Sequence, residues 1–181
     1  LVSNKALQML KILFLTFFLT VSPVLVLGQT ESEGPWSNDV VVEVALELIT
    51  ALPYATLITL DASGHPQART MEAFQPDEDL VVWMATNRNS AKVDEIRNDA
   101  RATLHYQVPN GLGYVVLTGQ SVLVDDEDAK AKWWRDSWEE FYPDRSLYLL
   151  IKFIPSHLEV VSYEHEMIGH EGTWQAPRAD L

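Results

Sequence analysis

The chain has 181 residues, 47% of them hydrophobic, which is enough apolar material for one sizeable core but hardly for two. Lysine and arginine number 13 against 26 aspartate and glutamate, and the resulting formal charge of -13 argues against nonspecific binding to nucleic acid or to anionic lipid. The lack of cysteine excludes disulfides, thiolate metal sites and a cysteine nucleophile.

Residues 1–28 have the order of a secretory signal peptide, because Lys5 and Lys11 precede an uncharged apolar run. As a helix, that run would extend only about 24 Å, which is shorter than the ~30 Å hydrocarbon core of a bilayer. We therefore expect a cleaved signal or, alternatively, an uncleaved N-terminal anchor, and hence an exported or envelope-attached protein. A misplaced start is the third alternative, because the sequence begins with Leu1, and it would make the protein cytoplasmic.

Residues 29–38 are polar and typical of a linker, which leaves residues 39–181 as one folded domain. The first element expected in this domain is a helix over 40–52, where valine and leucine recur at helical spacing behind Asn38 as a possible N-cap.

Most of the remaining chain alternates between runs of β-forming residues and clusters of turn residues. The turn residues DASGH connect the first two of these runs and predict a β-hairpin. The strands that we expect cover 54–60, 66–74, 79–86, 101–108 and 114–124, followed by one or two closing strands around Pro155 within 146–163. The fold class is therefore mainly β (α+β), with a mostly antiparallel, meandering sheet.

Residues 125–141 predict a second amphipathic helix, with acidic residues in its first turn and Ala131, Trp134, Trp138 and Phe141 along one face. Core or interface contacts are a commoner explanation for these tryptophans than stacking on a sugar or a flavin.

Two histidine–glutamate pairs near the C-terminus resemble a metal site at first sight. However, the spacing from His165 to His170 is one residue too long for the HExxH arrangement that binds zinc. We therefore expect no metal site, and no serine lies in a GxSxG nucleophile motif either.

Polar side chains gather where the strand that ends at Thr86 meets the helix that begins near Ser90. A helix N-terminus presents unpaired backbone N–H groups and about half a positive charge, to which Ser90 adds a hydroxyl and Lys92 an ammonium group. Arg69, on the preceding hairpin, would complete a phosphate site if the strands bring it close. From the residues alone, a capped surface helix beside a solvated lysine remains the alternative.

The order of several short motifs resembles that of the pyridoxamine 5'-phosphate oxidase-like flavin-binding split barrels, and within them the general stress protein group. The motifs are ARTM on the second strand, WMATN on the third, SxK at the helix start, then DARATLHY and a strand ending in LTG. The resemblance extends over about 39–163. It implies a six-stranded antiparallel split β-barrel with flanking helices, a homodimer, and FMN bound between the two subunits.

Carried over residue by residue, the resemblance implies that Arg69 and Lys92 hold the FMN phosphate with the help of Ser90. It implies that the flavin ring is lined, largely through backbone groups, by Thr70, Met71, Ala85 and Thr86. One of the two tryptophans Trp134 and Trp138 would reach the flavin ring of the partner subunit.

The chain departs from the oxidases that make pyridoxal phosphate at the positions that serve their substrate. Phe74 stands where they have a lysine, Ala91 precedes Lys92 where they have a basic pair, and Tyr114 stands in place of a glutamine. Their C-terminal arginine and histidine have no counterpart near Trp174. The flavin site is thus kept in this comparison, whereas the vitamin B6 substrate site is lost.

The resemblance therefore predicts an FMN-binding flavoprotein that is a flavin-dependent oxidoreductase with an unknown small-molecule substrate. The alternatives are a nonenzymatic protein that stores or senses flavin or haem, and a cofactor-free barrel that serves as an interaction module.

Overall fold

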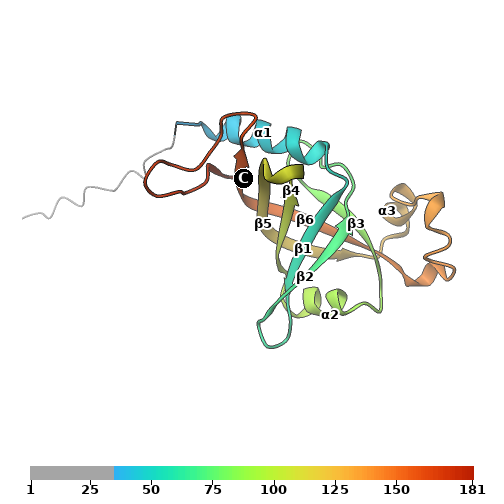
Figure 1. Cartoon of the computed structure of the whole chain (residues 1–181). Coiled ribbons are helices and arrows are strands. Elements are labelled where there is room, and N and C mark those ends of the chain that lie inside the picture. The colour runs from blue at the N-terminus through green and yellow to red at the C-terminus, as the bar shows by residue number, and fades with distance from the viewer. Residues whose placement is uncertain (1–34) are drawn as a thin grey trace, which may run out of the picture. The chain divides into compact units, whose positions relative to one another are not determined.

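Seven strands form one antiparallel sheet in residues 35–181, the part of the chain that this computed structural model describes (Figure 1). The predicted signal or anchor segment 1–28 and most of the predicted linker 29–38 lie outside the described residues. Among the described helices, none is long and apolar enough to cross a membrane.

Apart from β7, the helices and strands follow the order expected from the sequence. The helices are α1 (Asn38–Thr50), α2 (Ala91–Asn98) and α3 (Glu127–Lys132). The strands are β1 (Tyr54–Leu60), β2 (Pro66–Glu72), β3 (Val82–Asn87), β4 (Arg101–Gln107), β5 (Gly113–Val124), β6 (Tyr148–Ser162) and β7 (Arg178–Asp180). The N-cap of α1 is Ser37, one residue before the predicted Asn38, and it makes no side-chain capping bond.

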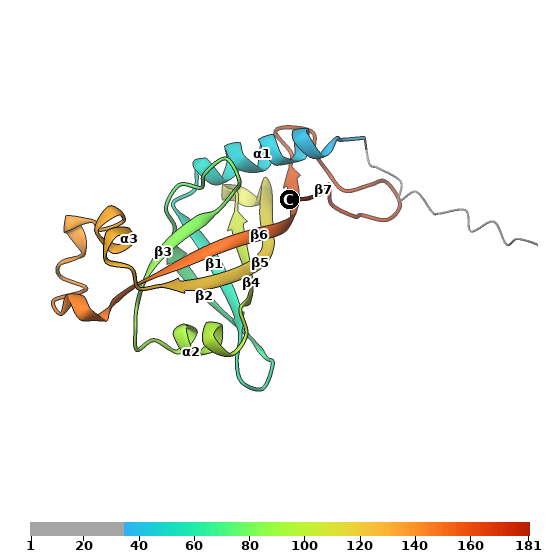
Figure 2. The ribbon, with the colours of Figure 1, turned by 180° about the vertical axis from the view of Figure 1, so that it is seen from behind.

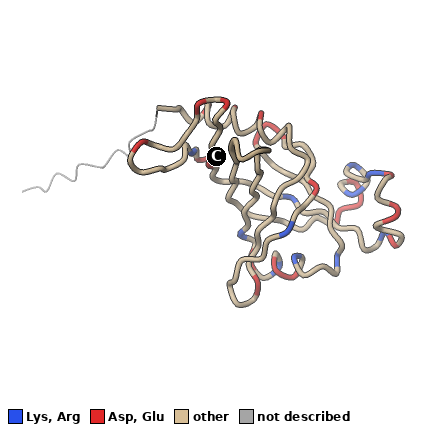
Figure 3. The backbone as a smooth tube through the Cα atoms, viewed as in Figure 1, with Lys and Arg blue, Asp and Glu red and all other residues tan. Residues whose placement is uncertain are grey.

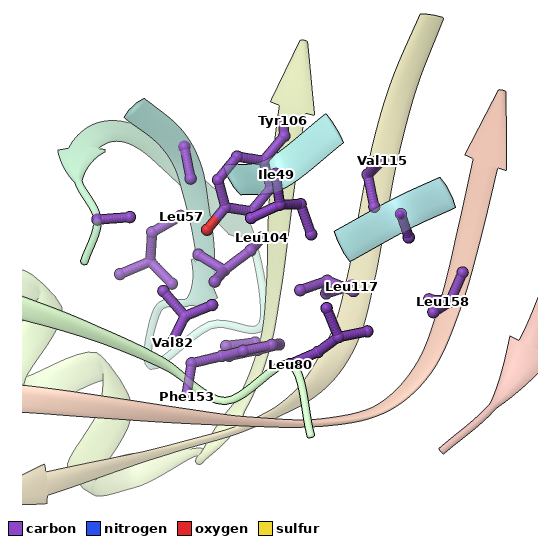
Figure 4. Packing of buried hydrophobic residues seen from close by; sticks show 14 of the residues in the cluster. Ile49, Leu57, Leu80, Val82, Leu104, Tyr106, Val115, Leu117, Phe153 and Leu158 are labelled. Atoms are coloured by element: carbon purple, nitrogen blue, oxygen red, sulfur yellow. The ribbon is translucent and has the colours of Figure 1, made fainter. Parts of the chain in front are cut away.

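The sheet curls into a split barrel because alternate residues of each strand are apolar and face inward. Leu57, Leu104, Leu117 and Phe153 come from four different strands and are completely buried in a common core, which Figure 4 shows from close by. The strand order is β2-β1-β4-β5-β6-β3, and β7 pairs with β6 beside this path. The predicted antiparallel split-barrel fold is thereby confirmed.

The closing segment around Pro155 is one strand, β6, with a bulge where it crosses β5. The partners change from Thr118 with His157 to Gly119 with Pro155, so Ser156 is an extra residue on β6. A Cβ atom on Gly119 would lie 2.1 Å from a backbone carbonyl oxygen of β6, so only glycine fits there. Such a bulge bends the strand and increases its twist, which helps the sheet to curl.

The edge strands β2 and β3 meet at one end of the barrel and separate at the other. An isolated bridge joins Ala73 to Met84, and the amide of Phe74 donates a hydrogen bond of 2.9 Å to the carbonyl of Trp83. Beyond this bridge, no ladder joins the two strands within 35–181. Helix α2 packs on β1 and β5 at the end away from α1, as both ribbon views show (Figures 1 and 2).

The prediction of one amphipathic helix over 125–141 is wrong. Helix α3 ends at Lys132, and Trp138 lies in a separate turn of 3-10 helix, while both Ala131 and Phe141 are exposed. We call residues 125–147 the aromatic lobe; it projects from the barrel beside β3 and carries both acidic and basic residues (Figures 2 and 3). Its tryptophans do not lie along one face of a helix but come together across a turn. Their packing against the barrel stabilises this arrangement more than a continuous helix would.

The C-terminal tail contributes β7, which the sequence pattern did not predict. The strand has only three residues and pairs with β6 from His157 to Glu159. In the turn that precedes it, His165 Nδ1 lies 2.8 Å from the Ser162 hydroxyl and His170 Nδ1 lies 3.2 Å from the Thr173 hydroxyl.

Candidate functional site

The polar residues at the junction of β3 and α2 come together at the open end of the barrel. Thr86 is inward-facing and only 2% exposed, and its hydroxyl lies 3.1 Å from the Ser90 hydroxyl. The Lys92 ammonium donates a hydrogen bond of 3.3 Å to the Thr86 hydroxyl. The turn between β3 and α2 thus brings the Thr86 and Ser90 hydroxyls close together and places the Lys92 ammonium beside the Thr86 hydroxyl.

Ser90 occupies the N-cap position of α2, but its side chain does not cap the helix. Its backbone is extended, with φ -79° and ψ 146°, and its carbonyl accepts a 2.9 Å hydrogen bond from the Val93 amide. Because the hydroxyl turns toward Thr86, no side-chain cap covers the N-terminal amides of the helix. These amides and the positive end of the helix dipole are therefore available to an anion.

Arg69 reaches the same region from β2 and is held there by two side chains that the sequence analysis did not identify. Arg69 Nη2 lies 2.6 Å from Glu95 Oε2, and Arg69 Nη1 donates to the Thr59 hydroxyl. The Thr59 hydroxyl in turn donates to Glu95, whose residue is 9% exposed. A weak signal existed in the sequence, because Glu95 lies three residues after Lys92 and hence on the same face of the helix.

Lys92 is half-buried rather than a solvated surface lysine. Burial lowers its pKa, the neighbouring Arg69 cation lowers it further, and the Glu95 carboxylate acts in the opposite direction. In the described part of the chain, no carboxylate lies within ion-pair distance of its ammonium. The ammonium therefore remains without a direct counterion beside a second cation.

The donor set at this end of the barrel matches the chemistry of a phosphate monoester. Arg69 and Lys92 supply two positive charges and Glu95 one negative charge, which leaves a net charge of one positive unit. The remaining N–H groups of both cations, two hydroxyls and the helix N-terminus are hydrogen-bond donors for phosphate oxygens. The residues present therefore fit a phosphate group. An aromatic cofactor without a phosphate would leave most of these donors unused.

The predicted flavin-lining residues lie on the two separated edges of the barrel. Thr70 on β2 faces outward, whereas Met71 faces inward and is 8% exposed within the core. Ala85 on β3 packs against the aromatic lobe, and Thr86 faces inward. Strands β2 and β3 are the two edge strands of the sheet, so the backbone groups on their unpaired edges face the gap between them. The Met71 side chain, in contrast, belongs to the core.

Trp134 and Trp138 lie inside the aromatic lobe of their own chain. Trp138 is 7% exposed and packs on Tyr148 with ring centroids 6.0 Å apart. Trp134 is half-buried, stands edge-on to Tyr148 at 5.3 Å, and carries the Arg145 guanidinium 4.2 Å from its ring centroid. Both tryptophans therefore pack within their own chain. Trp138 has little exposed surface left for contact with a partner subunit.

Of the positions that depart from the vitamin B6 oxidases, Phe74 has a structural role here. Phe74 packs on Trp133 with ring centroids 4.6 Å apart, and the Arg135 guanidinium lies 4.3 Å from the Phe74 ring. Arg135 is also paired with Glu72, so this cation has its own carboxylate. Trp174, near which the oxidases' C-terminal pair would lie, is 88% exposed.

A shallow hollow of about 590 Å³ lies elsewhere, between α1 and the loop before β3. Its lining includes Asp77, Glu78 and Asp79, and these carboxylates would repel a phosphate. The junction of β3 and α2 is therefore the better candidate for an anionic ligand.

Three solved structures with similar folds are informative. General stress protein 26 from Bacillus anthracis is 24% identical, with a TM-score of 0.58 over 66% of this chain and 92% of that chain. A protein related to general stress protein 26 from Clostridium acetobutylicum is 17% identical, with a TM-score of 0.65 over 81% and 97%. A pyridoxamine 5'-phosphate oxidase-related, FMN binding protein from Nostoc punctiforme is 18% identical, with a TM-score of 0.57 over 83% and 98%.

A comparison with curated protein sequences gives no match. The family described as Pyridoxamine 5'-phosphate oxidase like matches residues 41–163, from within α1 to just beyond β6. This is more than half of the chain and includes the whole split barrel, so the chain belongs to the pyridoxamine 5'-phosphate oxidase-like family.

Proposed function

We propose that this protein binds FMN and that the junction of β3 and α2 holds its phosphate. The observation that carries the proposal is the half-buried Lys92 ammonium, which lies next to the Arg69 cation without a direct counterion. Glu95 offsets only one of these two positive charges, so a bound anion would stabilise the partly desolvated site. The description of the Nostoc punctiforme relative as FMN binding supports this choice of ligand.

In this proposal, each residue of the site has a distinct task. Lys92 and Arg69 bind phosphate oxygens through charge-assisted hydrogen bonds, and Ser90 and Thr86 contribute hydroxyls. The isoalloxazine ring lies along the separated edges of β2 and β3, where backbone groups hold its polar atoms. The bound flavin would supply electron-transfer or hydride-transfer chemistry.

We further propose that a second copy of the chain completes the flavin site. The open end of the barrel has no strand between β2 and β3 in the described residues. On the outer face of the sheet, Val122 on β5 and Ile154 on β6 are 43% and 41% exposed, although they are apolar. Pairing of two copies about a twofold axis would bury such residues and cover the flavin ring.

The activity that we propose is flavin-dependent oxidoreduction of a small molecule other than a vitamin B6 phosphate. Phe74 carries no charge and Arg135 is already paired with Glu72, so neither offers a free cation for a second phosphate near the end of β2. The substrate must therefore be recognised by other means than a phosphate contact at this position.

The proposal is tested by titrating the purified protein with FMN and with riboflavin, which differ only in the phosphate. We expect FMN to bind at least about a hundredfold more tightly, since several charge-assisted hydrogen bonds depend on the phosphate. The absorbance spectrum of the protein as purified should show oxidised flavin. Equal affinities for the two flavins would rule out the phosphate site.

A further inference from the structure

Glu95 is a buried carboxylate beside the site proposed for a phosphate, which calls for an explanation. It lies on α2, accepts a hydrogen bond from the Thr59 hydroxyl on β1, and lies 2.6 Å from Arg69 Nη2 on β2. Arg69 also donates to Thr59, so the three side chains form a closed triangle that connects α2, β1 and β2. The Glu95 side chain is only 11% exposed, so water screens the charge of this carboxylate poorly.

A carboxylate in this position repels a phosphate, so its presence weakens anion binding unless it has a compensating effect. Two such effects follow from its contacts. The triangle holds the Arg69 guanidinium at the end of the barrel in one orientation, where its remaining N–H groups can reach a ligand. The negative charge of Glu95 also offsets the repulsion between Arg69 and Lys92.

We propose that Glu95 is a positioning residue of the phosphate site, which orients Arg69 and balances part of the positive charge before the ligand arrives. The proposal rests on the proposed function, because it assigns a role within that same site. It also makes Glu95 a determinant of specificity, since the site keeps one net positive charge instead of two. A site with a single net charge and fixed donors favours one well-placed phosphate over unselective binding of polyanions.

The charged groups that face Lys92 come from two elements. Arg69 approaches from β2 and Glu95 from α2, whereas β3 contributes the uncharged Thr86, and the uncharged Thr59 on β1 contacts Glu95. Within 35–181, no other titratable group affects the pKa of Lys92 appreciably. We therefore expect removal of the Glu95 charge to lower the pKa of Lys92, because only the desolvation and the Arg69 repulsion would remain.

The experiment compares Glu95→Gln with Glu95→Asp and with the matched control Asp94→Asn. Asp94 is the neighbouring acid on α2, but its side chain is 76% exposed and pairs with Arg97 at 2.9 Å. FMN and riboflavin affinities are measured by calorimetry from neutral to alkaline pH. The Lys92 pKa is measured by NMR in the flavin-free protein, so that one readout is independent of any bound cofactor.

We expect Glu95→Gln to weaken FMN binding about tenfold while riboflavin binding is unchanged. Simple removal of a negative charge would instead strengthen FMN binding. The pH at which FMN affinity declines should also shift downward, together with the Lys92 pKa. Glu95→Asp should keep the Lys92 pKa closer to that of the wild type but still weaken FMN binding, since its shorter side chain holds Arg69 less well, and Asp94→Asn should change nothing.

The outcomes separate the two proposals. If wild-type protein binds FMN and riboflavin equally, the phosphate site itself is wrong, and the role of Glu95 is wrong with it. If wild-type protein prefers FMN but Glu95→Gln binds it as tightly with an unchanged Lys92 pKa, only the positioning role is refuted. Should Glu95→Gln fail to fold, the Glu95→Asp variant decides, because wild-type FMN affinity in that variant would refute the positioning of Arg69.

Discussion

The residue with the least ordinary environment at the candidate site is Lys92. Most lysines keep their ammonium in water, but this one is half-buried between a second cation and a hydroxyl. Its lowered pKa has opposite consequences for the free protein and for the complex. In the free protein, the unfolded chain binds more protons between the folded and the unfolded pKa, so the contribution of Lys92 to stability rises with pH there.

Binding of FMN should have the reverse pH dependence. A phosphate stabilises the ammonium form, so the affinity for FMN should fall as the pH rises through the lowered pKa of Lys92. Measurements should start at about pH 7, where the phosphate itself is mostly dianionic because its second pKa is about 6. Lys92→Arg should flatten this decline, since arginine stays charged, whereas Lys92→Met should bind FMN weakly at every pH. Riboflavin affinity provides the control, because it should not change with pH over this range.

Phe74 leads to a prediction about the substrate. Its ring is enclosed by Trp133 and by the Arg135 guanidinium, and Arg135 is already paired with Glu72. A second phosphate near β2 would therefore be left without a free cation, which is costly. We expect the FMN-loaded protein to turn over pyridoxine 5'-phosphate poorly, as followed by the formation of pyridoxal 5'-phosphate. Robust turnover would contradict this assignment of the departures.

At the scale of elements, the contact between β5 and β6 determines how the barrel closes. Strand β6 has 15 residues and lies between β5 and β3, and the bulge at Ser156 bends it while its pairing with β5 continues on both sides. The tight approach at Gly119 is part of this bend, because the backbone of β6 occupies the space that a side chain would need.

Gly119→Ala should therefore destabilise the protein strongly. The new Cβ atom would meet the Ile154 carbonyl oxygen at 2.1 Å and Pro155 Cα at 2.7 Å, and neither backbone atom can move easily. We expect a loss of about 3 kcal/mol in the free energy of unfolding, measured with a chemical denaturant, since overpacking typically costs 1–3 kcal/mol or more. Thr118→Ala, at the exposed neighbouring position, is the control and should cost far less. A loss below about 1 kcal/mol for Gly119→Ala would mean that β6 shifts readily.

At the scale of the whole molecule, the aromatic residues of the lobe make their contacts within one chain. The rings of the lobe pack on one another and on Phe74 and Tyr148 within one chain. Trp138 is thus a poor candidate for an interface residue, and charge placed there would disrupt the lobe itself. The apolar surface that remains for a partner includes Val122 and Ile154 on the outer face of the barrel.

We expect the protein to be a dimer whose formation is linked to FMN binding. Val122→Glu or Ile154→Glu should weaken both dimerisation and FMN binding, because each would bury an unpaired charge in the proposed interface. Phe141→Glu is the matched control: this ring is 72% exposed on the lobe, and its change should leave the dimer intact. Sedimentation at micromolar concentration, with and without FMN, measures the outcome. A monomer that retains stoichiometric flavin would contradict the shared site.

Local signals in the sequence were sufficient for most of the elements. Strand β1 was predicted with its observed ends, and β2 to β5 to within a few residues, because apolar alternation and turn residues act over short distances. The junction of Thr86, Ser90 and Lys92 was also visible, since a strand end and a helix start lie within seven residues, 86–92.

Other features depended on partners that are distant in sequence. The helix predicted over 125–141 ends early because Trp133, Trp134 and Trp138 gain more by packing on Phe74 and Tyr148 than along one helix face. Strand β7 was missed because three residues are too few to show the alternation of apolar and polar residues that marks a strand. Only their pairing with β6 makes them a strand.

The sequence by itself determined the mainly β architecture, the family and the residues that we propose hold a phosphate, because these depend on local patterns and short motifs. Only the tertiary structure decided the charge balance of the site. Arg69, Thr59 and Glu95 come from three separate elements, and their hydrogen bonds form only when β1, β2 and α2 meet at the open end of the barrel. Desolvation follows from the same convergence, since Lys92 loses water only where the barrel and the helix enclose it.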